Sequence, residues 1–434
     1  MKTDAPKVIK LSEYKKPDYL VETIDLVIHL DNTQTLVQSK LKITRNTSEK
    51  TPLVLNGEEL ILKSIKLDGV SYTDYKHDTE NYFLTLNSVP ESFTLEIENV
   101  INPEANKTLD GLYKSGTIFC TQNEPEGFRR ITFYVDRPDN MAKFTTKIIA
   151  DKKLFPILLC NGNPLDQGDL PDGKHFVTWE DPFKKPAYLY ALVAGDLGVI
   201  KDTYKTTSGR TVKLEIYCDK GNENKCHHAM ESLKKSMKWD EDRFGLEYDL
   251  DIYMIVAVDA FNMGAMENKG LNIFNSAYVL ADQKSATDGN FYGIESVIGH
   301  EYFHNWTGNR ITCRDWFQLT LKEGLTVFRD QEFSADMNSR SVERIHSVQR
   351  LRMAQFAEDA GPTSHPIKPA TYMEINNFYT ATIYEKGAEV IRMIQTLLGV
   401  DGFRRGMDKY FELFDGQAVR TEDFIHSMSI ANDN

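Results

Sequence analysis

The pentapeptide His300-Glu301-Tyr302-Phe303-His304 combines residues that can bind a metal ion with one that can activate water. In an α-helix, residues four apart lie about 40° apart around the axis, so His300 and His304 can present ring nitrogens to one ion. Glu323 follows after an 18-residue gap and can supply a third ligand. Two imidazoles and one carboxylate leave the fourth position of a zinc ion open for water, as in catalytic zinc sites.

Glu301 is one residue further around the helix than His300, so it points beside the metal, where it can act as a general base on water. The formal charge of about +1 on such a site helps to lower the pKa of bound water toward roughly 7. Chance occurrence on a solvated helix is the alternative interpretation of the pentapeptide alone, and Glu323 argues against it. His227 and His228 are adjacent, so they diverge by about 100° on a helix and cannot chelate one ion.

Two helices joined by a turn are predicted to position these side chains. Residues 296–306 form the first helix, Gly308-Asn309 supplies the turn, and residues 321–337 form the second helix. Asp330 lies seven residues after Glu323 on the same helical face, which makes it a candidate for orienting an imidazole. A further helix is predicted to begin at a capping box of Thr382 and Glu385 and to stop at Gly399.

Residues 19–198 have the pattern of short strands and turns. Residues 24–30 alternate with period two, Asp31-Asn32 forms a turn, and residues 37–43 return as the hairpin partner. After Leu197 strands are predicted over 212–218 and 249–258 and a helix over 224–244, and helices dominate from Ile294. The sequence therefore predicts a multidomain protein, with an N-terminal all-β domain of extended sheets over residues 1–196 and an α+β catalytic domain over residues 197–434.

Composition restricts the partners. The chain has 434 residues, a formal net charge of −13 and ordinary globular hydrophobicity, which argues against nucleic acid and anionic membrane surfaces. No apolar leader follows Met1, and the longest apolar run, residues 252–258, is too short to span a bilayer. The five cysteines are odd in number and scattered, which fits a reducing compartment. We expect a cytoplasmic protein.

The segment Met263-Gly264-Ala265-Met266-Glu267-Asn268 follows the predicted strand 249–258. Gly264 permits close backbone approach, and an edge strand here could bind a peptide by β-augmentation; a plain loop is the alternative. Together with HExxH and Glu323, this segment resembles the gluzincin aminopeptidases of the aminopeptidase N family. Residues 305–310 and 322–330 resemble the bacterial branch of that family in particular.

The resemblance implies roles for individual residues. It implies a thermolysin-like catalytic domain that binds one zinc ion through His300, His304 and Glu323, with Glu301 as the base. Glu267 matches the glutamate that holds the α-amino group of the substrate, a group that is largely cationic at neutral pH. Further matching residues are Gln122 and Glu124 for the same amine pocket, Tyr384 for the oxyanion, Met263 with Tyr379 nearby for the first side chain, and Gly264, Ala265, Met266 and Asn268 for the peptide.

Each of these matches has a structural alternative. From spacing alone, Glu124 reads as a surface acid. Tyr384 reads as a tyrosine packed in the first turn of a helix, and Met263 and Tyr379 read as residues that fill the core.

The expected function is a monomeric zinc aminopeptidase that removes neutral or basic residues, alanine-like ones included, from peptides with a free N-terminus. A thermolysin-type endopeptidase is an alternative that would not need Glu267 or Glu124. An epoxide hydrolase like the bifunctional relative of the family is another. The third is a catalytically impaired, truncated peptide-binding fragment, because bacterial members of the family continue past the catalytic domain whereas this chain ends at Asn434.

Overall fold

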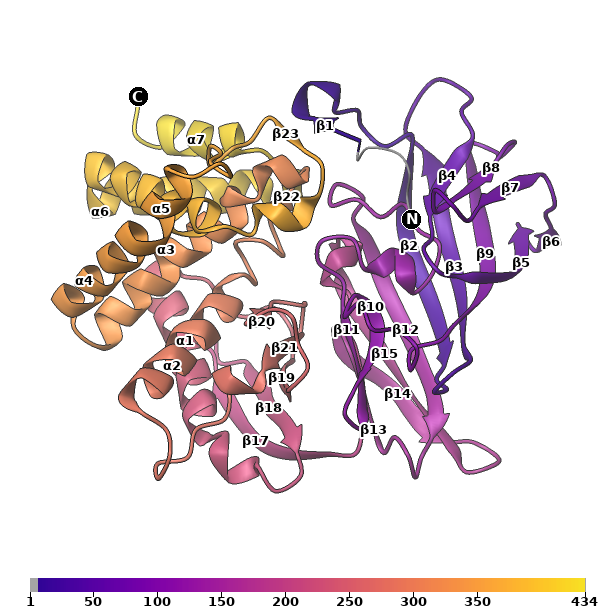
Figure 1. Ribbon diagram of the computed structural model, residues 1–434, viewed down its shortest axis with the longest axis horizontal. Coiled ribbons are helices and arrows are strands. Elements are labelled where there is room, and N and C mark those ends of the chain that lie inside the picture. Colours follow the sequence, from indigo (N-terminus) through magenta and orange to yellow (C-terminus); the bar gives the residue numbers. More distant parts are fainter. Residues whose placement is uncertain (1–6, 434) are drawn as a thin grey trace. The chain divides into compact units, whose positions relative to one another are not determined.

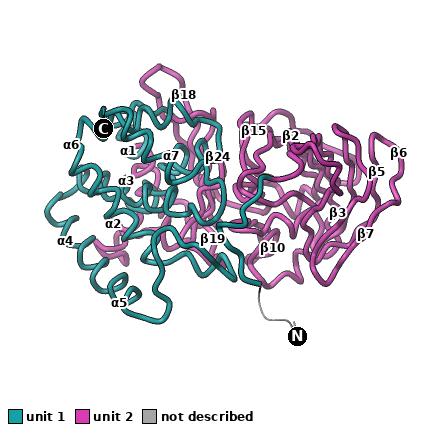
Figure 2. The backbone as a smooth tube through the Cα atoms, turned by 90° about the horizontal axis from the view of Figure 1, so that it is seen from above, with its two compact units in different colours: residues 1–16, 235–247, 295–434 teal, residues 17–234, 248–294 magenta. Residues whose placement is uncertain are grey.

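A computed structural model describes residues 7–433 of the chain. The chain forms two compact units that do not follow its linear order (Figure 2). Unit 1 comprises Met1–Lys16, Lys235–Glu247 and Glu295–Asn434, and unit 2 comprises Pro17–Lys234 and Tyr248–Ile294. Helices α1 (His227–Phe244) and α2 (Asp288–Phe303) each begin in unit 2 and end in unit 1. The boundary expected near Leu197, where strand β17 begins, stays a prediction.

The largest sheet of unit 2 has eight strands (Figure 1). Its central strands alternate buried and solvent-facing residues, which is the period-two pattern that the sequence carries. The predicted hairpin is present, because β2 and β3 pair antiparallel around the turn at Asp31. The strand order is β14 (Asn163–Asp169), β15 (Lys174–Lys185), β12 (Ala142–Asp151), β2 (Tyr19–His29), β3 (Thr35–Arg45), β9 (Ser92–Ile101), β5 (Ile61–Leu67) and β6 (Val70–Ser71).

Two smaller sheets accompany it in unit 2. A four-stranded sheet has the order β10 (Gly111–Ser115), β11 (Ile118–Gln122), β16 (Leu192–Gly195) and β13 (Ile157–Cys160). A three-stranded sheet has the order β4 (Leu53–Asn56), β8 (Phe83–Leu86) and β7 (Tyr75–Asp78). Extended sheets therefore account for the first part of the chain, as the sequence predicts.

A five-stranded sheet follows in the chain, still within unit 2. Its order is β17 (Leu197–Lys205), β18 (Thr211–Asp219), β19 (Ile252–Val258), β21 (Leu271–Asn275) and β20 (Ala265–Met266). Strand β19 is buried at every position, as its continuous apolar sequence requires. The short strand β20 pairs antiparallel with β21 at the edge of the sheet, so the predicted edge strand is confirmed.

Helices dominate unit 1. Helix α3 (Thr320–Met337) is buried from Thr320 to Ala335, although it carries several charged residues. Trp239 packs against Phe303 of α2 and Phe333 of α3, with ring centroids 4.9 and 5.9 Å away. The other helices are α4 (Arg340–Arg350), α5 (Phe356–Asp359), α6 (Gly387–Phe414) and α7 (Thr421–Ile430), and two short strand pairs, β1 (Ile9–Lys10) with β23 (Thr371–Tyr372) and β22 (Thr312–Cys313) with β24 (Ala418–Val419), complete the unit.

The predicted capping box at Thr382 is wrong, whereas the break at Gly399 is confirmed. Thr382 lies inside a π-helical turn, Thr382–Lys386, that runs into α6. Its backbone N–H and hydroxyl both donate to the Glu358 carboxylate, at 2.7 and 2.6 Å. The acceptor that caps this helix start therefore comes from another helix and not from the local sequence. Gly399 interrupts α6 with a φ of 72°.

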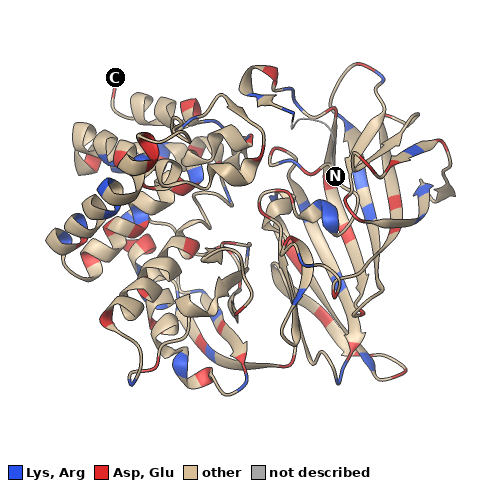
Figure 3. Ribbon diagram, viewed as in Figure 1, with Lys and Arg blue, Asp and Glu red and all other residues tan. Residues whose placement is uncertain are grey.

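Charged residues of both signs are interspersed over strands and helices (Figure 3). No helix among residues 7–433 is long and apolar enough to cross a membrane. All five cysteines are buried free thiols.

Candidate functional site

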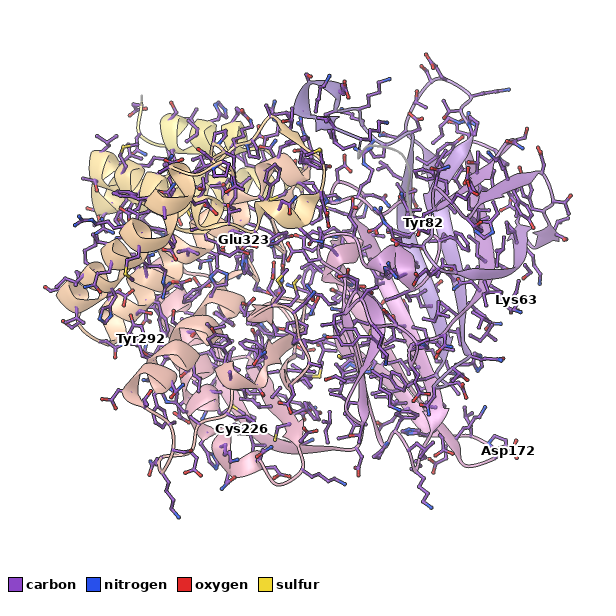
Figure 4. The ribbon with its side chains drawn as sticks, viewed as in Figure 1. Lys63, Tyr82, Asp172, Cys226, Tyr292 and Glu323 are labelled. Atoms are coloured by element: carbon purple, nitrogen blue, oxygen red, sulfur yellow. The ribbon has the colours of Figure 1, made fainter. Side chains whose placement is uncertain are left out.

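Unit 1 brings the three predicted metal ligands together (Glu323 is labelled in Figure 4). The Nε2 atoms of His300 and His304 lie 3.0 Å apart. The Oε2 atom of Glu323 lies 3.5 Å from His300 Nε2 and 3.3 Å from His304 Nε2. Ligand atoms of tetrahedral zinc, with bonds of about 2.0 to 2.1 Å, are separated by roughly 3.3 Å. The three side chains therefore fit zinc in number, type and spacing.

Hydrogen bonds at the other ring nitrogens orient both imidazoles. The Nδ1 atom of His300 lies 2.6 Å from Asp330 Oδ2, which is the contact that the spacing of Asp330 predicts. The Nδ1 atom of His304 lies 2.9 Å from the Thr307 carbonyl oxygen and 3.2 Å from Thr326 Oγ1. Because an acceptor faces each Nδ1, a neutral ring keeps its proton there, which leaves its Nε2 lone pair available to a metal ion.

The electrostatics of the triangle favour an ionised carboxylate. Burial alone would raise the pKa of Glu323, but Lys322 and the two imidazoles outweigh burial and hold that pKa well below its usual range. Burial likewise opposes a charged His300, but its hydrogen bonds to Asp330 and Glu323 prevail and raise its pKa well above the ordinary value. In the metal-free protein the cluster therefore holds a proton that a cation must displace.

A fully buried ion pair supports the end of the helix that carries the histidines. Arg329 and Asp240 are both 0% exposed and are hydrogen-bonded to each other. Arg329 Nη1 also donates to the Phe303 carbonyl oxygen at 2.8 Å and to Thr307 Oγ1 at 3.0 Å. Phe303 precedes His304 in the chain and Thr307 follows it by three residues, so this guanidinium fixes the backbone whose carbonyl group orients His304.

The predicted base and the predicted oxyanion donor lie close to the histidines. Glu301 is 6% exposed, and a carboxylate oxygen of Glu301 lies within 4.8 Å of a His304 ring nitrogen. The Tyr384 ring is nearly parallel to that of His300, with an interplanar angle of 15° and centroids 6.4 Å apart. Tyr384 lies in the π-helical turn that precedes α6, a feature that is frequent at functional sites.

The predicted substrate residues of unit 2 form a second cluster. Gln122, at the end of β11, directs its Nε2 at the Met266 sulfur of β20, 3.7 Å away. Carboxylate oxygens of Glu124 and Glu267 lie within 4.8 Å of each other, and these residues are only 4% and 3% exposed. The alternative that Glu124 is a surface acid is therefore wrong.

The other residues of the segment 263–268 differ in burial. Asn268 is buried, Met263 and Ala265 are half-buried, and Gly264 is exposed. A Cβ on Gly264 would lie 3.3 Å from the Tyr278 ring, which is tight, so glycine suits this position.

Sequence reasoning missed Thr307, Thr326, Lys322 and the pair of Arg329 with Asp240. Lys322 and Arg329 could have been found from the sequence. Apolar residues lie on every side of their predicted helix, so the helix is expected to be buried, and buried charged side chains need partners. No comparable signal marks Thr307, whose contribution is a backbone carbonyl group.

Two protein-family models match this chain. The model of the peptidase M1 N-terminal domain matches residues 13–189, and that of the peptidase family M1 domain matches residues 228–434. The chain belongs to peptidase family M1. The first match covers the extended sheets, and the second covers both histidines, Glu323 and Tyr384. This agrees with the predicted order of an all-β domain followed by a catalytic domain.

Relatives of the M1 family are similar over nearly all of this chain. Aminopeptidase N of Escherichia coli K12 is 59% identical over 99% of this chain and 49% of its own length, and that of Caulobacter vibrioides is 55% identical over 98% and 49%. The crystal structure of Legionella pneumophila aminopeptidase A in complex with aspartic acid has a TM-score of 0.93 and 36% identity, over 99% of this chain and 49% of that one. The chain spans about half the length of the curated relatives it matches.

Proposed function

We propose that this M1 chain carries the catalytic centre of a zinc aminopeptidase, with one zinc ion held by His300, His304 and Glu323. The observation that carries the proposal is the ligand triangle, with edges of 3.0, 3.3 and 3.5 Å and an acceptor behind each imidazole. Zinc bound by two neutral imidazoles and one carboxylate keeps an open position, polarises a carbonyl group and makes water a nucleophile near neutral pH.

The residues around the triangle supply the proton transfers. Glu301 takes the proton of the attacking water and delivers it to the leaving amine, a role that its burial beside His304 supports. The Tyr384 hydroxyl donates a hydrogen bond to the oxygen that becomes negative as the carbonyl group is attacked. The stacking of Tyr384 on His300 supports that role.

Amino-terminal selectivity is assigned to Glu267 and Glu124, with Gln122 beside them. Two buried carboxylates within 4.8 Å repel each other, and a cation between them removes the repulsion. An α-amino group, with a pKa near 8, is largely cationic at neutral pH and meets that need. A peptide laid along edge strand β20 would extend the sheet by β-augmentation, with Gly264, Ala265 and Asn268 in contact with its backbone.

Contact with the side chain of the first residue is assigned to Met263. A flexible, half-buried methionine can admit several side chains, which supports a preference for alanine-like, other neutral or basic residues. The Legionella relative was solved with aspartic acid, an acidic amino acid, so a panel of alanyl, arginyl and aspartyl p-nitroanilides tests this preference directly. Faster cleavage of the aspartyl compound than of the other two would overturn it.

The decisive experiment compares free and blocked substrates. With zinc near one per chain, the protein should hydrolyse alanyl p-nitroanilide and leave N-acetyl-alanyl p-nitroanilide intact. Glu301→Gln should lower the rate by about 10² to 10⁴-fold with zinc retained. Glu98→Gln, on the exposed face of β9 where it binds Gln38, is the matched control with unchanged activity. Cleavage of N-acetylated peptides would indicate an endopeptidase, and zinc without turnover would indicate a peptide-binding fragment.

We further propose that the protein is a cytoplasmic monomer. Free thiols at all five buried cysteines support a reducing compartment. Light scattering at micromolar concentration tests the monomer, and a dimer mass would contradict it.

A further inference from the structure

Lys322 is a buried cation at the proposed zinc site that this site's chemistry does not use. Its side chain is 1% exposed, and its Nζ lies 2.5 Å from Oε1 of Glu323. The other oxygen of that carboxylate, Oε2, is the one that faces the two histidines, 3.5 and 3.3 Å from their Nε2 atoms. The two oxygens of Glu323 therefore have different partners.

This division of the carboxylate has a chemical consequence. Lysine is almost never fully buried unless it is paired, and here the pairing partner is the ligand itself. A carboxylate can bind a metal through one oxygen or through both, and a two-oxygen ligand would occupy the position that water and substrate need. The ammonium group on Oε1 opposes that second contact. It also withdraws electron density from the carboxylate, so a metal ion bound to Oε2 keeps more of its charge for polarising a carbonyl group.

We propose that Lys322 is a positioning residue that holds Glu323 as a one-oxygen ligand and weakens its donation, so that zinc binds less tightly but is a stronger Lewis acid. The proposal rests on the proposed zinc site and adds that Lys322 lowers the zinc affinity of that site. A lysine that only neutralised buried charge would support the folded ligand triangle, and its removal would weaken zinc binding. A lysine that competes with the metal for the carboxylate has the opposite effect on affinity.

The test uses Lys322→Met, which keeps the length of the side chain and removes the charge, and Lys322→Arg, which keeps the charge. Competition with a chelator measures the zinc dissociation constant of each zinc-loaded protein. We expect Lys322→Met to bind zinc about tenfold more tightly than wild type, because no ammonium group competes for the carboxylate. It should lose about 10 to 100-fold in kcat, with KM nearly unchanged. The zinc affinity and kcat of Lys322→Arg should be closer to those of wild type than the values of Lys322→Met are.

A spectroscopic readout reports the number of ligand oxygens independently of turnover. In the cobalt-substituted proteins, the visible absorption of Lys322→Met should be weaker than that of wild type, because a second carboxylate oxygen raises the coordination number. Lys185→Met is the matched control, since Lys185 is equally buried and lies 3.1 Å from Asp181 in unit 2. Its loss should lower stability and leave zinc affinity and the cobalt spectrum unchanged.

The outcomes separate this inference from the proposed function. If wild type binds zinc and cleaves alanyl p-nitroanilide, the proposed function stands whatever the Lys322 variants do. Zinc affinity at or below the wild-type value in Lys322→Met would overturn the role of Lys322. Should that variant fail to fold, Lys322→Gln, which keeps an N–H donor without the charge, must also bind zinc more tightly than wild type, and equal or weaker binding is the refuting result.

Discussion

The hydrogen bond between His300 and Asp330 should strengthen zinc binding at the proposed site, because it holds the imidazole in place. His300 Nδ1 and Asp330 Oδ2 are 2.6 Å apart, and their side chains are only 14% and 11% exposed. A hydrogen bond to a charged group contributes about 1.5 to 3 kcal/mol. Asp330→Ala removes it entirely, so zinc binding should weaken by roughly 10 to 100-fold. Asp330→Asn keeps a neutral acceptor of the same shape and should lose about half of that free energy.

The assay is chelator competition on the zinc-loaded variants, with kcat on alanyl p-nitroanilide measured at saturating zinc. Asp408→Asn is the control, because Asp408 is half exposed and pairs only with Arg404 on the same helix among the described contacts of residues 7–433. Exposed pairs of that kind contribute about 0 to 1 kcal/mol, so its zinc affinity should match wild type. Wild-type zinc affinity in Asp330→Ala would refute the argument that this carboxylate orients the imidazole.

Three further predictions concern the same unit. Burial opposes a charged His300, but its hydrogen bonds with Asp330 and Glu323 raise its pKa. The imidazolium therefore stabilises the folded state fully below about pH 6.5, the ordinary pKa, and this stabilisation is lost as pH rises through the raised pKa. Urea unfolding of metal-free protein from about pH 6 to 9 should show that fall, and a flat profile would contradict it. Arg329→Met leaves the Asp240 carboxylate buried without its guanidinium and should cost about 3 to 5 kcal/mol by urea unfolding, whereas the double variant with Asp240→Leu should cost less. Tyr384→Phe should lower kcat by about 10² to 10³-fold with zinc content unchanged, and wild-type kcat would exclude Tyr384 as the oxyanion donor.

Elements with strong local periodicity could be predicted from the sequence. The hairpin of β2 and β3 follows from alternation around Asp31, and α3 follows from its helical spacing. The parallel pairing of β2 with β12 places Thr23 beside Lys143. No local sequence pattern predicts a pairing between strands so far apart in the sequence. The Thr382 capping box failed for the same reason, since Glu358, from an earlier helix, accepts the hydrogen bonds of that helix start.

The sequence by itself determined which histidines can share a metal ion, because the helical period places His300 and His304 on one face whatever surrounds them. Spacing also marked Glu323 as a third ligand, and the resemblance to the aminopeptidase N family marked Glu124 and Glu267 as candidates for the amine pocket. Only the tertiary structure decided which ring nitrogen of each histidine faces the triangle, because the acceptors Asp330 and Thr307 reach the rings through packing. The tertiary structure likewise placed Lys322 beside one oxygen of Glu323. The reason is burial, because a buried ammonium group is stable only when it is paired with a carboxylate.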